Sequence, residues 1–251
     1  MTAERRIARA TRLVGQPGQV VPRAMLDRVN ALLDASTGMQ IRFGPHRLGS
    51  WETCLVGGFV AGTAVWVSAG LAVELPVGLL AALPACWAAA FLAVRFRMLR
   101  TGVIRLVWHR HALVGVSLAV ATAVLTSAEV HEVLDVWSTG CAVGLAIGRL
   151  GCHRSGCCLG RAALIGPRYQ WLGGRERHLP LQLAEALWCL VLAVAGGALL
   201  RAAPAGTAAS VVAGGYTVVR VPLHRLRAPL ARGGRRRKRR HRVIDGSSES
   251  F

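Results

Sequence analysis

Two arginines and several glycines occupy a short stretch that directly follows an apolar segment. Residues 148–161 read GRLGCHRSGCCLGR. Arg149 and Arg161 could bind a phosphate group, because a guanidinium group forms paired hydrogen bonds with phosphate oxygens. Gly148 and Gly160 would let the backbone turn and approach a ligand closely. Irregular backbone at a membrane boundary is tolerated where it lines a polar cavity, so this pattern predicts an anion-binding loop.

A second polar group lies near the start of a later apolar segment. Residues 177–186 read RHLPLQLAEA, in which His178 precedes a predicted helix. Gln182 and Glu185 share one face of the first turns of that helix. An ionisable side chain inside an apolar segment is costly and marks a functional site by default. A structural ion pair between Glu185 and an arginine is the alternative.

The last apolar segment carries a polar stripe. Tyr216, Arg220, His224 and Arg227 are spaced by four, four and three residues, which places them on one side of a helix. Such a stripe faces protein or a ligand rather than lipid.

Three cysteines fall within the first stretch. Cys152, Cys157 and Cys158 with His153 have the spacing C-H-x-x-x-C-C, which is not a standard zinc arrangement, and no second Cys/His pair follows nearby. We therefore expect no metal and no cofactor, and we interpret these cysteines as small packing residues. A reactive thiol or disulfide is one alternative, and a metal site is another.

Apolar helices must position these residues. Six apolar segments follow residue 47, and most approach the ~20 residues that cross a bilayer core. They show little two-residue alternation and are rich in Gly and Ala, as packed membrane helices are. The predicted fold is an all-α, polytopic membrane helix bundle with about six transmembrane helices, and a soluble bundle of buried helices is the alternative. The segments are 51–73, 76–94, 111–128, 133–147, 181–200 and 206–223.

Composition and charge favour a membrane protein. Hydrophobic residues make up 53% of the 251 residues and charged residues only 17%, against about 25% charged residues in soluble domains. The net charge of +19 concentrates in the N-terminal segment, in alternate loops and in the run RRRKRRHR near the C-terminus. We interpret that run as a topology anchor on anionic headgroups, and expect no nucleic-acid partner.

The chain accordingly divides into three parts. A basic polar segment covers 1–47 and includes a short amphipathic helix around 23–33. A transmembrane helical domain covers 48–228, with a signature loop at 148–178. A polybasic, disordered tail is expected at 229–251.

In their order, the motifs resemble those of the prolipoprotein diacylglyceryl transferase family. The family's Gly-Arg-hydrophobic-Gly and Gly-x-x-x-Gly-Arg elements look like residues 148–151 and 156–161. Its His-Pro-x-Gln-Leu-Tyr-Glu-Ala element looks like residues 178–186, with Leu179 extra and Ala184 in place of the tyrosine.

The family's Tyr-x-x-x-Arg…Arg element resembles Tyr216, Arg220 and Arg227, so the resemblance covers roughly residues 41–228. It implies a multi-pass enzyme of the bacterial inner (plasma) membrane. Such an enzyme moves a diacylglyceryl group from phosphatidylglycerol to the lipobox cysteine thiol of a prolipoprotein. The implied partners are phosphatidylglycerol or another anionic phospholipid and the prolipoprotein lipobox peptide. Displacing glycerol phosphate needs cations to stabilise developing charge and a base for the thiol.

The resemblance also implies roles for single residues. Arg149 would match the signature arginine that binds the lipid phosphate, and Gly160 a signature glycine. Arg220 or Arg227 would supply the second basic group, with Arg227 taken as catalytic. His109 or His111 would replace the family's His-Gly-Gly element as base, and we take His111 as the candidate. The remaining lipid-binding candidates are Gly148, Arg161, His178, Gln182, Glu185 and Tyr216.

Several positions depart from the family pattern. Trp51 stands where the family has tyrosine, Cys152 and Ser155 where it has asparagine, and His224 where it has an acid. The family's seventh span is expected to be missing. These departures favour an alternative, a non-catalytic relative that binds anionic phospholipid, and a membrane thiol protein is a third hypothesis. Orientation is open, because the positive-inside rule places the signature loop in the cytoplasm and the resemblance places it outside.

Overall fold

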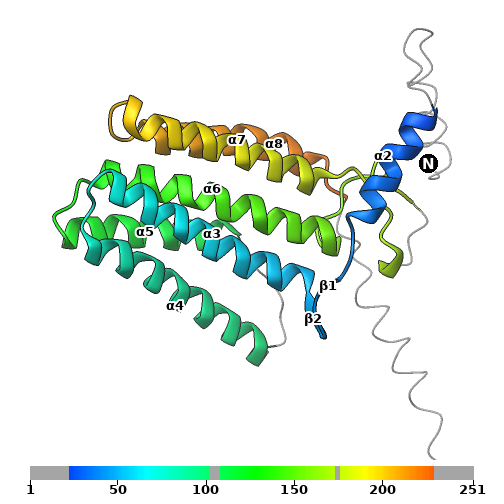
Figure 1. The fold of residues 1–251 in the computed structure, drawn as a ribbon, viewed down its shortest axis with the longest axis horizontal. Helices are drawn as coiled ribbons and strands as arrows, with labels where there is room; N and C mark the ends of the chain where they lie inside the picture. The colour runs from blue at the N-terminus through cyan, green and yellow to red at the C-terminus, as the bar shows by residue number, and fades with distance from the viewer. Residues whose placement is uncertain (1–22, 102–107, 173–175, 229–251) are drawn as a thin grey trace, which may run out of the picture.

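The structure is a computed structural model that describes residues 23–101, 108–172 and 176–228 as a helical bundle with one short hairpin (Figure 1). Helix α2 (Arg23–Ala35) leads through the antiparallel strands β1 (Gln40–Phe43) and β2 (His46–Gly49) into the bundle. The bundle helices and one 3₁₀ turn follow in the order α3 (Ser50–Ala72), α4 (Val77–Thr101), α5 (Trp108–Leu125), α6 (Val130–Ser155), η1 (Gln170–Leu172), α7 (Leu181–Ala202) and α8 (Thr207–Arg225).

The helical fold class is confirmed for the described residues, and the amphipathic helix expected around 23–33 is α2. The hairpin is not predicted, because its strands lack apolar alternation. The prediction of a loop from Gly148 is wrong, since α6 continues to Ser155. Arg149 does not end the helix because its charge is buried and paired. The loop therefore begins at Gly156, whose positive φ of 67° closes the helix in a left-handed turn.

Three of the described helices are long and apolar enough to cross a membrane, namely α3, α6 and α7. The apolar stretches 77–89 in α4 and 113–125 in α5 are shorter. These helices indicate a membrane protein, and the count of six spans stays a prediction.

Helix α6 occupies the centre of the bundle and packs against α3, α5, α7 and α8 (Figure 1). Glycines let α3 and α6 approach closely. A Cβ added at Gly58 would lie 2.6 Å from the carbonyl oxygen of Gly144, and one added at Gly62 would lie 2.8 Å from that of Gly140. Small residues at such contacts stabilise membrane helix pairs through close packing. Helix α3 therefore supports α6 on the side opposite to α7 and α8.

Asp135 of α6 fixes the start of α8. Its carboxylate accepts hydrogen bonds from the backbone N–H groups of Gly206 (2.7 Å) and Ala209 (2.6 Å). These N–H groups have no partner within the helix, and the negative charge also complements the positive end of the helix dipole. Trp188 of α7 donates to the carbonyl of Gly215 in α8 at 2.9 Å. The three helices α6, α7 and α8 are thus held in register.

Helix α2 holds the loop that joins α6 to α7. The Asn30 side chain donates to the carbonyl of Leu164 (3.1 Å) and accepts from the N–H of Gly166 (3.0 Å). Asp34 forms a two-pronged ion pair with Arg177, with both N–O distances at 3.0 Å. Residues 164–166 and Arg177 of this loop are therefore held against a surface helix at the end of the bundle.

Candidate functional site

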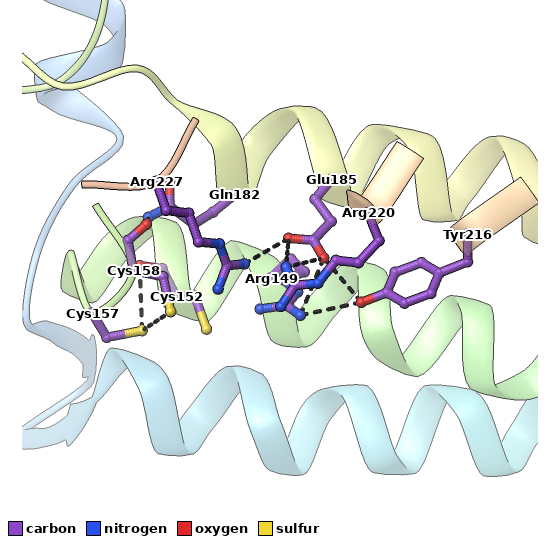
Figure 2. A network of polar contacts seen from close by, with 9 residues as sticks. All are labelled: Arg149, Cys152, Cys157, Cys158, Gln182, Glu185, Tyr216, Arg220 and Arg227. Carbon is purple, nitrogen blue, oxygen red and sulfur yellow. Dashed lines mark hydrogen bonds and ion pairs between the residues drawn. The ribbon is translucent and has the colours of Figure 1, made fainter. Parts of the chain in front are cut away.

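Three arginines converge on the carboxylate of Glu185 (Figure 2). Arg149 Nη2 lies 3.1 Å from Oε1, and Arg220 Nη1 lies 2.7 Å from Oε1 and 3.0 Å from Oε2. Arg227 Nη2 reaches Oε2 at 3.3 Å. The Tyr216 hydroxyl donates to Oε1 at 2.9 Å and accepts from Arg149 at 3.3 Å. We call these five residues the Glu185 cluster.

The Glu185 cluster is buried and carries excess positive charge. The Glu185 side chain is 2% exposed, that of Arg149 10%, and those of Arg220 and Arg227 about a fifth. Three guanidinium groups against one carboxylate leave a surplus of two positive charges. Among the described residues, Nε of Arg149 and Nε of Arg227 are buried without a hydrogen-bond partner. A surplus of charge and unused donors at one place suit an anion.

Four separate elements bring the cluster together. Arg149 comes from the last turns of α6, Glu185 from the first turns of α7, and Tyr216 and Arg220 from one face of α8. Arg227 comes from the segment after α8, and the packing of α6, α7 and α8 against one another keeps the four elements together. Of the predicted stripe, Tyr216 and Arg220 lie on α8, whereas Arg227 follows the helix and still reaches the cluster. His224 is exposed and lies outside the cluster.

Arg227 follows α8 and is held by the loop after α6. Gly160 pairs with Arg227 as an antiparallel bridge. Next to this bridge, the N–H of Arg161 donates to the carbonyl of Leu226 and the N–H of Ala228 to that of Leu159, both at 2.9 Å. A Cβ at Gly160 would overlap the carbonyl oxygen of Leu179, so only glycine fits here. Gly160 thus acts through packing and backbone pairing.

The other predicted site residues lie around the cluster rather than in it. The Arg161 side chain is exposed, and its backbone does the pairing described above. His178 Nδ1 lies 3.0 Å from the carbonyl oxygen of Gly160, so this contact connects the two ends of the loop between α6 and α7. A Cβ at Gly148 would meet no atom within 4 Å, so this position is open. His111 belongs to α5, but its side chain lies outside the described residues.

Gln182 connects the cluster to the cysteines. It is 1% exposed, and its amide nitrogen donates to the carbonyl oxygen of Cys158. Its own oxygen is buried without a partner among the described residues. Gln182 and Glu185 therefore share one face of α7, as the spacing predicts, and Gln182 holds the turn that follows α6.

The thiols of Cys152, Cys157 and Cys158 gather at the end of the site near Arg227 (Figure 2). We call them the cysteine cluster. All three sulfur atoms lie within 4.8 Å of one another, with 3.7 Å between Cys157 and Cys158. Sequence reasoning missed this grouping. The sequence feature that could have indicated it is Gly156, because a left-handed glycine after a helix folds the next residues back onto the last turn.

The cysteine cluster lies in a positive environment. Hydrogen bonds from Cys152 and Cys157 lower the pKa of the Cys158 thiol well below its usual value, and the charges of Arg227 and Arg149 lower it further, while burial opposes the shift. The cysteine cluster and the Glu185 cluster therefore share one positively charged region.

Comparison with known protein families matches this chain to the model of prolipoprotein diacylglyceryl transferase over residues 104–236, just over half of the chain. The matched range includes every residue of the Glu185 cluster and of the cysteine cluster. A comparison with curated proteins finds no match.

Proposed function

The chain belongs to the prolipoprotein diacylglyceryl transferase family, and from that premise we propose that it moves a diacylglyceryl group from phosphatidylglycerol to the cysteine thiol of a prolipoprotein lipobox peptide. The observation that carries the proposal is the buried surplus of positive charge around Glu185. A phosphodiester has one negative charge and two free oxygens, which suit the guanidinium groups of Arg149 and Arg227.

The reaction breaks the bond between the glycerol carbon and a phosphate oxygen. Negative charge grows on that oxygen as the bond breaks, and buried cations stabilise it more strongly than water does. Arg149 and Arg227 are the catalytic candidates because each has a buried Nε without a partner. Arg220 is already doubly bound to Glu185 and serves to position that carboxylate.

Glu185 and Tyr216 have a positioning role in this proposal. The carboxylate keeps three like charges together in the absence of lipid, and Tyr216 links it to Arg149. Gln182, Gly160 and His178 hold the loop that carries Arg227. Removing a positioning residue should therefore loosen the arginines without changing their number.

The incoming thiol needs a base, and His111 is our candidate for it. The site would lie in a bacterial plasma membrane crossed by six helices, of which three have the required length and apolarity among the described residues. Gly148 and Arg161 would contact lipid at the edge of the Glu185 cluster. The proposed domain division keeps the transmembrane domain at 48–228, with segments 1–47 and 229–251 outside it.

A genetic test follows. The gene should restore growth and lipoprotein processing in a bacterium depleted of its own enzyme, and Arg149→Ala should fail to do so. Arg201→Ala is the matched control, because Arg201 is exposed at the end of α7. Failure of the well-expressed natural chain to rescue, or rescue by Arg149→Ala as good as by Arg201→Ala, would contradict the proposal.

One observation favours a second candidate, a non-catalytic protein that binds anionic phospholipid. Glu185 already contacts all three arginines, as an internal anion would in a site that has lost turnover. The two candidates differ in a simple measurement. The second predicts tight binding of phosphatidylglycerol with no release of glycerol phosphate.

A further inference from the structure

The cysteine cluster has the geometry of a metal site. Two sulfur atoms bound to one tetrahedral zinc ion, at about 2.3 Å each, lie about 3.8 Å apart. The sulfur atoms of Cys157 and Cys158 are 3.7 Å apart, and that of Cys152 lies within 4.8 Å of both. For the third sulfur to bind the same ion, Cys152 at the end of α6 would have to lie closer to the other two.

The backbone preorganises this arrangement. Gly156 donates its N–H to the carbonyl of Cys152 at 3.0 Å, and its left-handed conformation turns Cys157 and Cys158 back toward α6. Gln182 holds the carbonyl of Cys158 from α7. Two helices and a glycine turn therefore fix the three thiols, whereas packing alone would not require them to meet.

Charge also fits a metal ion. Three thiolates together carry three negative charges, which could not persist so close to each other without a cation. A divalent ion reduces the total to one negative charge, which Arg149 and Arg227 nearby balance. With Glu185 included, the site keeps one surplus positive charge before the acceptor thiol binds.

We propose that Cys152, Cys157 and Cys158 bind one zinc ion, and that its fourth position accepts the thiol of the acceptor peptide. Among the described residues no fourth Cys, His, Asp or Glu completes the site. Zinc sites with three protein ligands keep the fourth position for water or substrate, whereas structural sites are closed by four. The assignment of the fourth ligand rests on the proposed transferase function.

The position of the cluster suits that role. Cys152 follows Arg149 by three residues on α6, which places it on the same face about 4.5 Å along the helix axis. The proton of a thiol bound at the metal passes to the base of the proposed function, and the thiolate is held beside the phosphate site. Its electron pair forms the carbon–sulfur bond while the carbon–oxygen bond breaks, and the leaving phosphate oxygen takes that bond's electrons. The products are a thioether and glycerol phosphate, so no oxidant or reductant is needed.

Metal binding can be measured without turnover. The full chain, purified under reducing conditions in detergent, should retain close to one zinc per chain after washing with a weak chelator. Cys157→Ser and Cys158→Ser should each lose it, and Cys86→Ser, which alters an exposed thiol of α4, should keep it. Retention no higher in the natural chain than in Cys158→Ser, or a disulfide within the cluster found by mass spectrometry, would overturn the site.

The fourth ligand has its own readout. In protein loaded with Co²⁺, a short peptide with a lipobox cysteine should change the visible absorption, and the same peptide with serine should not. No change with the cysteine peptide would overturn the acceptor role. A protein that passes both tests but releases no glycerol phosphate would contradict the proposed function and leave this site intact.

Discussion

Replacing Glu185 by glutamine tests the charge balance of the site. The carboxylate accepts four contacts of 2.7 to 3.3 Å from Arg149, Arg220 and Arg227, together with one of 2.9 Å from Tyr216. Glutamine has nearly the same shape but no charge, so the variant leaves three positive charges without their counterion. The change therefore separates charge from packing.

The expected loss of unfolding free energy follows from the burial of the ion pairs. Breaking a buried ion pair costs about 3–5 kcal/mol, and the partial exposure of Arg220 and Arg227 places this case near 3 kcal/mol. In a chain of this size that corresponds to a fall of about 6–12 °C in the thermal midpoint. Phosphatidylglycerol should restore more of the midpoint in the variant than in the natural chain, because the surplus charge rises from two to three.

Thermal unfolding in detergent, with and without phosphatidylglycerol, measures both effects. Glu132→Gln is the control, because it removes the same charge from an exposed side chain of α6. If Glu185→Gln shifts the midpoint no further than Glu132→Gln does, the carboxylate is not the counterion of the cluster. If lipid stabilises the variant less than the natural chain, the surplus charge does not bind phosphate.

Four further substitutions test how the site is supported. Gly160→Ala should displace the loop segment that pairs with Arg227 and lower the rate at which modified peptide forms at least tenfold. Gly148→Ala, at an open helical position, should leave the thermal midpoint unchanged or raise it. Asp135→Ala should remove the cap of α8 and cost about 0.5–2 kcal/mol in the unfolding free energy, and an unchanged value would refute the capping role. Gly144→Val should separate α3 from α6 and lower the midpoint, and a midpoint equal to that of the natural chain would refute the close packing.

Much of the fold follows from apolar runs, but helix α6 shows the limit of that reasoning. A charged residue normally ends an apolar segment in a sequence, so Arg149 is predicted to begin a loop. In the structure Arg149 is neutralised by Glu185, 36 residues later in the chain, and the helix continues through it to Ser155. Sequence spacing carries no information on such a long-range pair. The boundary of a helix that bears a buried charge therefore depends on its partner.

The candidate site was partly predictable. Regular spacing placed Gln182 with Glu185 on one helix face, and Tyr216 with Arg220 on another. In the structure Glu185 contacts Tyr216, Arg220 and Arg149. The grouping of the cysteines was not predictable from their spacing, because it depends on the left-handed turn at Gly156. Arg161 differs from these residues, since its exposed side chain lies outside the cluster and its contact with lipid stays a proposal.

The structure also refines the use of the positive-inside rule. That rule counts arginines in loops as free topology signals. Arg149 lies in a helix, and Arg227 pairs with Glu185, so neither is available for that count. Arg177 is bound to Asp34 in the same way. The basic character of the loop after α6 is therefore weaker than its composition indicates.

The central claim is that the Glu185 cluster binds the phosphate of phosphatidylglycerol and expels it during transfer. The most direct measurement incubates the purified protein with phosphatidylglycerol and a lipobox peptide, and follows peptide mass and released glycerol phosphate together. We expect a peptide heavier by one diacylglyceryl group and an equal amount of glycerol phosphate, with both lost in Arg149→Ala and kept in Arg201→Ala. Phosphatidylglycerol that binds but yields neither product, or equal yields from Arg149→Ala, would contradict it.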